Sequence, residues 1–276
     1  MKVLLTDGKG FIGSNFIEMF GKKYDLYVPD DEEEGFDRVE NALHMFEGET
    51  YDAVVHVVAS DAADALVAFK NVQYAAVAAG VPKMIVVTEA APPPKGDAVL
   101  AGDDTFDASA PLFSADLSRY LIPALVRKDN ISTMLRAFGL FGKGMPPASP
   151  LTKIFSAALT GKKPIALPPE KTFSVLYIDD LCKIVAKFLD GDLPKGVYNA
   201  ASPVAATYGE FAKKAKAYAK KTGREVAIEK NDRTGNEFTA NTEKLQNALG
   251  AFKFTSLATG VNKTLDYYVK HKSKLK

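Results

Sequence analysis

The chain has 276 residues, of which 47% are hydrophobic and 25% are charged, and its formal net charge is +1. These values are ordinary for a soluble globular protein, and the near-zero charge gives no reason to expect a membrane or nucleic acid as partner. The single cysteine, Cys182, excludes an internal disulfide. No apolar run reaches the ~20 residues of a membrane span, and no signal peptide precedes the first apolar segment, so we expect a cytoplasmic protein.

The first half of the chain alternates apolar segments with helical patterns. Apolar residues recur at helical spacing between the apolar segments, which lie at residues 2–5, 25–28, 52–59, 83–88 and 132–138. Continuous apolar strands separated by helices indicate a parallel sheet covered on both faces. With right-handed crossovers, this order predicts an α/β doubly wound sheet, that is, a Rossmann fold.

The second half has a mixed pattern that begins near residues 142–150. We assign residues 1–145 and about 173–202 to the Rossmann domain, and about 146–172 and 203–276 to a smaller α/β substrate-binding subdomain. Residues 173–189 predict a strand that runs into a helix capped by Asp179 or Asp180. Residues 210–224 predict a helix with one lysine-rich face. Solvation is the usual explanation for such a face, and contact with RNA or an acidic partner is the alternative.

The loop that follows the first strand reads TDGKGFIGSNF and is typical of phosphate binding. Gly10 would let the backbone approach a pyrophosphate, and Gly13 would allow close contact between helix and strand. The amides near Phe11 and Ile12 would face the anion. Asp7 stands where the first glycine of such a loop is expected. A carboxylate there adds repulsion, although aspartate tolerates left-handed backbone better than most residues and Gly8 offers a way to shift the turn.

Five segments in the same order resemble motifs of the extended short-chain dehydrogenase/reductases, the NAD-dependent sugar-nucleotide epimerases and dehydratases. They are TDGKGFIGSNF, YDAVVHVVA, STMLRAFGLFGKGM, FSVLYIDDL and GVYNAAS. The resemblance implies that NAD, weakened by Asp7, is the cofactor. Asp30 would bind the ribose hydroxyls, with an ordinary turn residue as the alternative. It also implies a homodimer and a nucleotide-sugar ligand. The implied cofactor-binding residues are Gly8, Gly10, Phe11, Ile12, Gly13, Asp30 and Ala59.

The family's proton relay, a tyrosine and a lysine four residues apart, has no counterpart at the family position, and we interpret the one such pair in the chain, Tyr268 and Lys272, as a chance match. In the family, the lysine lowers the tyrosine pKa so that the hydroxyl can exchange a proton with a carbinol. The aligned positions hold Phe113 and Leu117. Thr88 matches the family's Ser/Thr, and Glu89 beside it is a candidate base. The alternative is that Thr88 simply ends a strand.

The same comparison indicates that this chain has fewer residues to bind the phosphates of a substrate. The family arginine that pairs with a sugar-nucleotide phosphate aligns with Phe173, and Lys171 is the nearest substitute, without bidentate geometry. Arg233 resembles the second diphosphate-binding arginine, with a solvated loop residue as the alternative. We interpret Arg136 as structural and His56 as a satisfied core histidine.

Two hypotheses follow from these residues. In the first, the chain is an NAD-dependent enzyme on a nucleotide sugar, working through an atypical group such as Thr88 with Glu89. In the second, it is a non-catalytic Rossmann-fold protein that binds a nucleotide, senses it or serves as a partner subunit, with RNA contact as a further option. The missing Tyr–Lys pair predicts that the family reaction by its usual route is absent.

Overall fold

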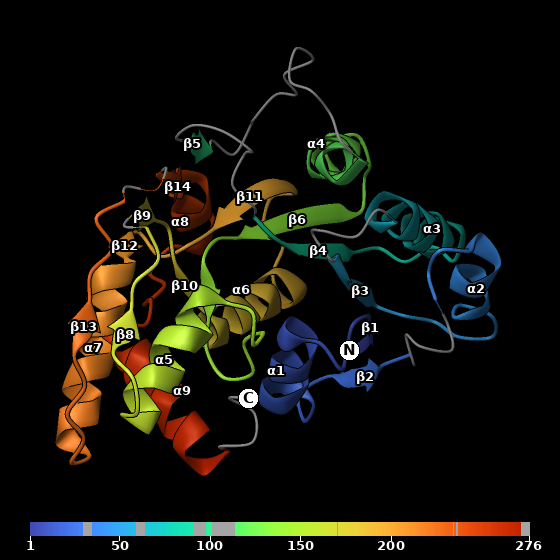
Figure 1. The fold of residues 1–276 in the computed structure, drawn as a ribbon. Coiled ribbons are helices and arrows are strands. Elements are labelled where there is room, and N and C mark those ends of the chain that lie inside the picture. The colour runs from blue at the N-terminus through green and yellow to red at the C-terminus, as the bar shows by residue number, and fades with distance from the viewer. Residues whose placement is uncertain are drawn as a thin grey trace.

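A computed structural model describes residues 1–29, 35–58, 64–90, 98–100, 114–169, 171–233, 235 and 237–271 (Figure 1). Its core is a six-stranded parallel sheet with the order β2-β1-β3-β4-β6-β11. The predicted doubly wound α/β fold is therefore confirmed. The strands are β1 (Lys2–Leu5), β2 (Asp25–Tyr27), β3 (Ala53–Val58), β4 (Met84–Glu89), β6 (Ser132–Ala137) and β11 (Gly196–Ala200).

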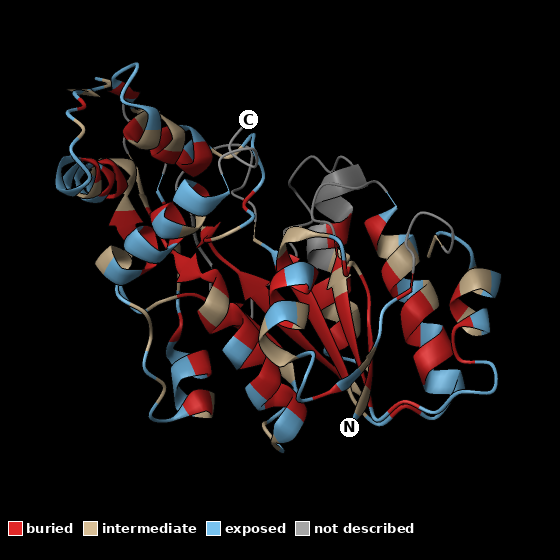
Figure 2. Ribbon diagram, turned by 90° about the horizontal axis from the view of Figure 1, so that it is seen from below, coloured by how far each residue is buried: buried red, intermediate tan, exposed pale blue. Residues whose placement is uncertain are grey.

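Helices cover both faces of this sheet. Alternating strand residues enter two separate apolar cores: Val3 and Leu5 lie in one, and Leu4 lies in the other. The first core is closed by α1 (Phe11–Phe20) and α6 (Ile178–Asp190). The second is closed by α2 (Val39–His44), α3 (Ala65–Ala78) and α4 (Ser114–Val126). Figure 2 shows the buried strands between these two helical layers.

The remaining elements form smaller sheets and helices at one end of the molecule (Figure 1). A mixed four-stranded sheet has the order β12-β9-β14-β5, and two pairs, β10 with β7 and β13 with β8, accompany it. The strands are β5 (Ala98–Leu100), β7 (Leu140–Phe141), β8 (Ile165–Ala166), β9 (Thr172–Phe173), β10 (Leu176–Tyr177), β12 (Ala206–Thr207), β13 (Ile228–Glu229) and β14 (Phe238–Ala240). The helices are α5 (Pro150–Thr160), α7 (Tyr208–Lys221), α8 (Glu243–Leu249) and α9 (Leu257–Lys270).

Aromatic packing and a helix cap hold this end together. The Phe211 ring of α7 lies 5.0 Å from the ring of Phe141 and 6.2 Å from that of Phe155. Such ring pairs stabilise beyond their buried area. Helix α7 starts with a capping box, in which Thr207 Oγ1 accepts from the Glu210 amide and Glu210 accepts from the Thr207 amide. The capping box therefore defines the residue at which α7 begins.

The start of α6 differs from the sequence prediction. The residue before the helix is Tyr177, no side chain caps it, and both Asp179 and Asp180 lie inside the first turn. Asp180 is buried, and its carboxylate accepts from the amide of Thr255 at 2.6 Å and from its hydroxyl at 2.9 Å. The predicted aspartate cap was wrong because this carboxylate instead ties α6 to a loop far along the chain.

Within the described ranges, no helix is both long enough and apolar enough to cross a membrane.

Candidate functional site

The loop between β1 and α1 makes its turn at Asp7. This residue has φ 58°, and it is the one non-glycine residue with positive φ in the part of the chain that the structure describes. The Gly10 amide donates to the Asp7 carbonyl oxygen at 3.0 Å, and α1 begins at the next residue. Aspartate thus adopts the left-handed conformation that the family glycine would favour. A glycine is needed at position 8 for a different reason: a Cβ there would overlap the side chain of Val28.

Gly13 allows the close helix–strand contact expected of this loop. A Cβ on Gly13 would overlap the carbonyl oxygen of Asp7. Phe11 and Ile12 open the helix, where the first amides of any α-helix lack intrahelical acceptors and carry the positive end of the dipole. The loop therefore has the close helix–strand contact at Gly13 that the sequence predicts.

The side chain of Asp7 is unfavourable for the binding of a pyrophosphate at this loop. A Cβ built on Gly10 would overlap both carboxylate oxygens of Asp7, so the carboxylate lies directly on the Gly10 backbone. In a dinucleotide-binding loop, this glycine is where the pyrophosphate approaches the chain. The carboxylate must leave Gly10 before a pyrophosphate can make that contact, and its negative charge opposes the phosphates.

Asn15 fixes the first turn of α1 and was missed by the sequence analysis. Its Nδ2 donates to the carbonyl oxygens of Phe11 at 2.8 Å and of Lys143 at 3.1 Å. The bond to Lys143 connects α1 to the glycine-rich segment after β7. A buried asparagine on an otherwise apolar helix face was the available signal.

Several predicted site residues lie outside the described residues. These are Asp30, Ala59 and Phe113. Leu117 lies in α4, so this helix position carries no lysine ammonium. One turn of the same helix holds Ser118, which is buried and whose Oγ has no partner within the described ranges.

His56 lies beside the loop and is a neutral core residue. Its Nδ1 is 3.0 Å from Thr6 Oγ1, which also accepts from the Val57 amide at 3.0 Å. The side chain is 2% exposed, and burial lowers its pKa to about 4. Its Nε2 has no partner within the described part of the chain, so the prediction of a satisfied core histidine holds for one ring nitrogen.

A polar row crosses three strands near their carboxyl ends. Thr88 of β4 pairs in register with Arg136 of β6, which pairs with Asn199 of β11. Arg136 is buried, and its Nε and Nη2 donate to Asn199 Oδ1 at 3.0 and 2.6 Å. Asn199 in turn donates to the carbonyl oxygen of Asn241 at 3.1 Å. This network agrees with the structural role expected for Arg136.

Thr88 and Glu89 leave β4 on opposite sides. Successive side chains of a strand point to opposite faces of the sheet. Thr88 is 8% exposed and shares its face with Met84 and Val86, in the core closed by α3 and α4. Glu89 is exposed at the end of the strand. The two groups that the sequence places side by side therefore do not converge on one point.

Lys171 and the segment of Arg233 lie next to each other in the smaller part of the molecule. A Cβ on Gly235 would lie 3.3 Å from the Lys171 Cβ. The Lys171 ammonium lies 5.8 Å from the ring centre of Phe173 and 5.9 Å from that of Tyr208, and burial lowers its pKa. Arg233 is exposed. Two cations on neighbouring segments could together meet an anionic ligand.

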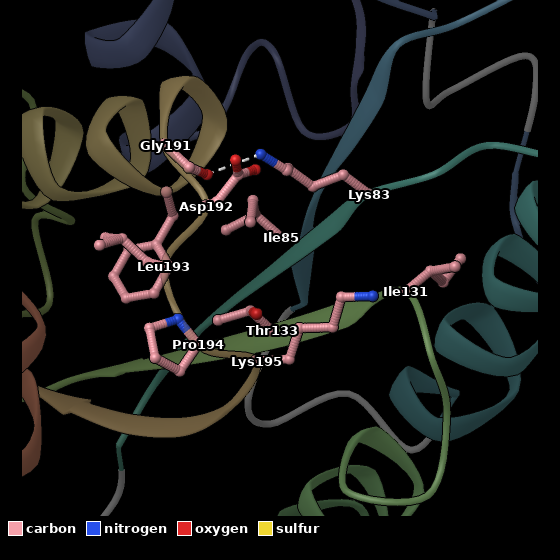
Figure 3. Close-up of a pocket in the computed structure, with 10 residues that line it drawn as sticks. Lys83, Ile85, Ile131, Thr133, Gly191, Asp192, Leu193, Pro194 and Lys195 are labelled. Carbon is pink, nitrogen blue, oxygen red and sulfur yellow. Dashed lines mark hydrogen bonds between the residues drawn. The ribbon is translucent and has the colours of Figure 1, made fainter.

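A pocket of 310 Å³ lies at the opposite end of the strands, where β4, β6 and β11 begin. Figure 3 shows the residues that line it. Lys83 donates from its Nζ to the carbonyl oxygens of Leu189 and Gly191, both at 2.9 Å. A cation at the carboxyl end of α6 stabilises the helix. Lys83 therefore has a structural role, and none of the residues that line this pocket belongs to the loop of Asp7.

Neither metal chemistry nor thiol chemistry is supported by the described residues. They contain no group of three or more His, Cys, Asp or Glu side chains able to hold a metal ion. Cys182 is buried in α6, and burial raises the pKa of its thiol to about 12. A thiol in that state does not form the nucleophilic thiolate.

No model of a known protein family matches the sequence, and no curated protein matches it either. Solved structures do match over nearly the whole chain. UDP-glucose 4-epimerase from Thermotoga maritima, solved with UDP-glucose, is 17% identical with a TM-score of 0.76, covering 99% of this chain and 100% of that one. UDP-glucuronic acid 4-epimerase from Bacillus cereus, solved with NAD, is 16% identical with a TM-score of 0.78, covering 99% and 98%.

A third match is a GDP-L-fucose synthetase from Naegleria fowleri, which is 14% identical with a TM-score of 0.79 and covers 99% of this chain and 93% of that one. At such low identity, the likeness concerns the fold. The chain has the fold of the NAD-dependent sugar-nucleotide epimerases and dehydratases, the extended short-chain dehydrogenase/reductases. The predicted resemblance is confirmed at that level, and activity has to be argued from the site itself.

Proposed function

We propose that this protein binds NAD(H) or a related nucleotide at the loop of residues 6–13, with an affinity limited by Asp7. Support comes from the backbone of the loop, where Gly13 allows close contact between helix and strand and the amino end of α1, which follows Gly10, would face the phosphates. Structural neighbours such as the Bacillus cereus epimerase are solved with NAD. The observation that carries the proposed limit on affinity is the Asp7 carboxylate on Gly10.

We further propose that the protein does not catalyse the family reaction by the usual proton relay. Position 113 is phenylalanine and position 117 is leucine, so neither side chain can exchange or tune a proton. Thr88 could still bond a substrate oxygen, and Lys171 with Arg233 could attract a diphosphate. Nucleotide sugars such as UDP-glucose are therefore ligands of this site rather than efficiently converted substrates. Loss of a positioned acid or base costs about 100- to 10,000-fold in rate.

Calorimetric titration with NAD⁺, NADH and NADPH tests the binding proposal. The wild-type protein should bind NAD(H) weakly, and Asp7→Gly should bind it at least about tenfold more tightly, since a glycine removes both the charge and the obstruction. Far-UV circular dichroism and thermal unfolding would show that the variant is folded. If neither protein binds any dinucleotide, the proposal is wrong, and the non-catalytic partner function would take its place.

A homodimer that uses α3 and α4 is also part of the proposal. Three large apolar side chains of α3 are exposed although the helix packs on α4: Val67 at 46%, Tyr74 at 58% and Val77 at 55%. Exposed apolar side chains gathered on one helix are typical of an interaction surface. We expect a dimer in sedimentation velocity, and Tyr74→Glu should convert it to a monomer.

Val204→Glu provides the matched control for this dimer test. Val204 is 72% exposed and belongs to neither α3 nor α4, so this charge should leave the dimer intact. A monomeric wild-type protein, or equal dissociation of both variants, would contradict the proposed interface.

A further inference from the structure

A second candidate binding site lies on the smaller part of the molecule, away from the loop of Asp7. A groove of 610 Å³ follows the exposed side of α5 and the segment that leads into β8. Lys153, Ser156 and Thr160 line it from the helix, and Lys162 and Lys163 line it from the segment. None of its lining residues belongs to residues 6–13, and neither Lys171 nor Arg233 is among them.

The groove is positively charged and not neutralised. Its lining contains Lys153, Lys162 and Lys163 and no aspartate or glutamate. Within the described ranges, no carboxylate forms an ion pair with any of these three lysines. Like charges around one hollow repel each other, and a bound anion would relieve that repulsion.

Helix stability does not explain the position of Lys153. This lysine lies in the first turn of α5, which holds no acidic residue. A cation at the amino end of a helix opposes the helix dipole, whereas an anion there is stabilised. Lys162 and Lys163 follow the carboxyl end, where cations are favourable for the helix alone. Lys153 is therefore the residue that points most clearly to an external anion.

The surrounding charge would concentrate anions at this groove. Residues 146–172 and 203–276 together hold 19 Lys and Arg against 8 Asp and Glu, while the rest of the chain holds 16 against 26. The net charge of +1 thus conceals two oppositely charged parts. In Figure 1, α5 and α7 lie at one end of the molecule, and α2 and α3 lie at the other. A local positive field raises the concentration and association rate of anionic ligands.

We propose that this groove binds a phosphorylated small molecule that carries at least two negative charges. Lysine binds phosphate as a point charge, and Ser156, which lies between Lys153 and Thr160 along α5, also lines the groove. Lys153 and Thr160 are seven residues apart, about 10 Å along a helix. That length suits an extended ligand such as a polyphosphate better than a single phosphate ion.

Inorganic triphosphate titrated into the full chain by calorimetry is the probe for this site. The variant Lys153→Gln/Lys162→Gln/Lys163→Gln should lose about tenfold or more in affinity. Lys213→Gln/Lys216→Gln/Lys220→Gln is the matched control, because it removes the same charge from exposed positions of α7 outside the groove. The control should bind within about twofold of wild type.

Two results would overturn the groove as a site: no binding by the wild-type protein, or equal loss in both triple variants, which would show a general field effect. The same variants distinguish failure of the groove proposal from failure of the proposed nucleotide binding at residues 6–13. Asp7→Gly should change NAD(H) binding without changing triphosphate binding, and the groove variant should do the reverse.

Discussion

The loop before α1 and the helix α4 differ in how closely they match the motifs of the extended short-chain dehydrogenase/reductases. The loop keeps its backbone shape, because Gly13 and the left-handed residue 7 are fixed by contact between helix and strand. The helix α4 packs against the sheet, and the sequence comparison predicts that its Leu117 takes the position of the relay lysine. Packing constrains the first region through backbone atoms, whereas the second needs particular side chains only for proton transfer. The fold therefore does not depend on the side chains that proton transfer requires.

The largest expected effect comes from introducing the Tyr–Lys pair whose absence we propose. We predict that Phe113→Tyr with Leu117→Lys, made in the Asp7→Gly background, raises turnover of nucleotide sugars by about 100-fold or more over Asp7→Gly alone. The reason is that the tyrosine hydroxyl and lysine ammonium supply the proton transfer. Product formation by chromatography would measure it. Efficient turnover by the wild-type protein, unchanged by these substitutions, would contradict the contrast between the two regions.

The next effect concerns His56, on the core face beside the loop. Its pKa is lowered to about 4 in the folded protein, against 6.5 for an exposed histidine. Between these values the unfolded chain binds a proton that the folded chain does not. Stability from neutral His56 is thus fully present above pH 6.5 and falls as the pH drops towards 4. The total is about 3 kcal/mol, at 1.36 kcal/mol per pKa unit.

Urea unfolding at several pH values between 7 and 4.5 measures this dependence. His56→Gln should flatten it, whereas His44→Gln, at an exposed position on α2, is the control that should leave it unchanged. An unaltered pH dependence in His56→Gln would show that the histidine is not buried as described.

A smaller effect tests the backbone of the loop. Gly13→Ala places a Cβ against the Asp7 carbonyl oxygen, which belongs to the main chain and cannot rotate away. We expect the free energy of unfolding to fall by about 1–3 kcal/mol, the usual cost of overpacking. Gly48→Ala is a useful contrast, because a Cβ there would meet no atom within 4 Å, although its φ of 72° adds some strain. Equal stability of Gly13→Ala and wild type would contradict the close contact between Gly13 and the Asp7 carbonyl oxygen.

The sequence was sufficient to predict the sheet, its helices and the close helix–strand contact at Gly13, because these depend on apolar periodicity and local backbone needs. It was insufficient where long-range contacts decide. Asp180 looks like a helix cap locally, yet its carboxylate is bound by Thr255. The link from Arg136 to Asn199 likewise joins strands 63 residues apart in the chain. Thr88 and Glu89 suggested a pair by adjacency, whereas strand geometry separates their side chains.

The central claim is that an intact loop is obstructed by its own carboxylate, and Asp7→Asn tests it most directly. Asparagine keeps the size and the tolerance for left-handed backbone while removing the charge. We predict that calorimetry gives tighter NAD⁺ binding for Asp7→Asn than for wild type, and tighter still for Asp7→Gly. The gain of Asp7→Asn should shrink as salt screens the repulsion. Identical NAD⁺ affinity in all three proteins would contradict the claim.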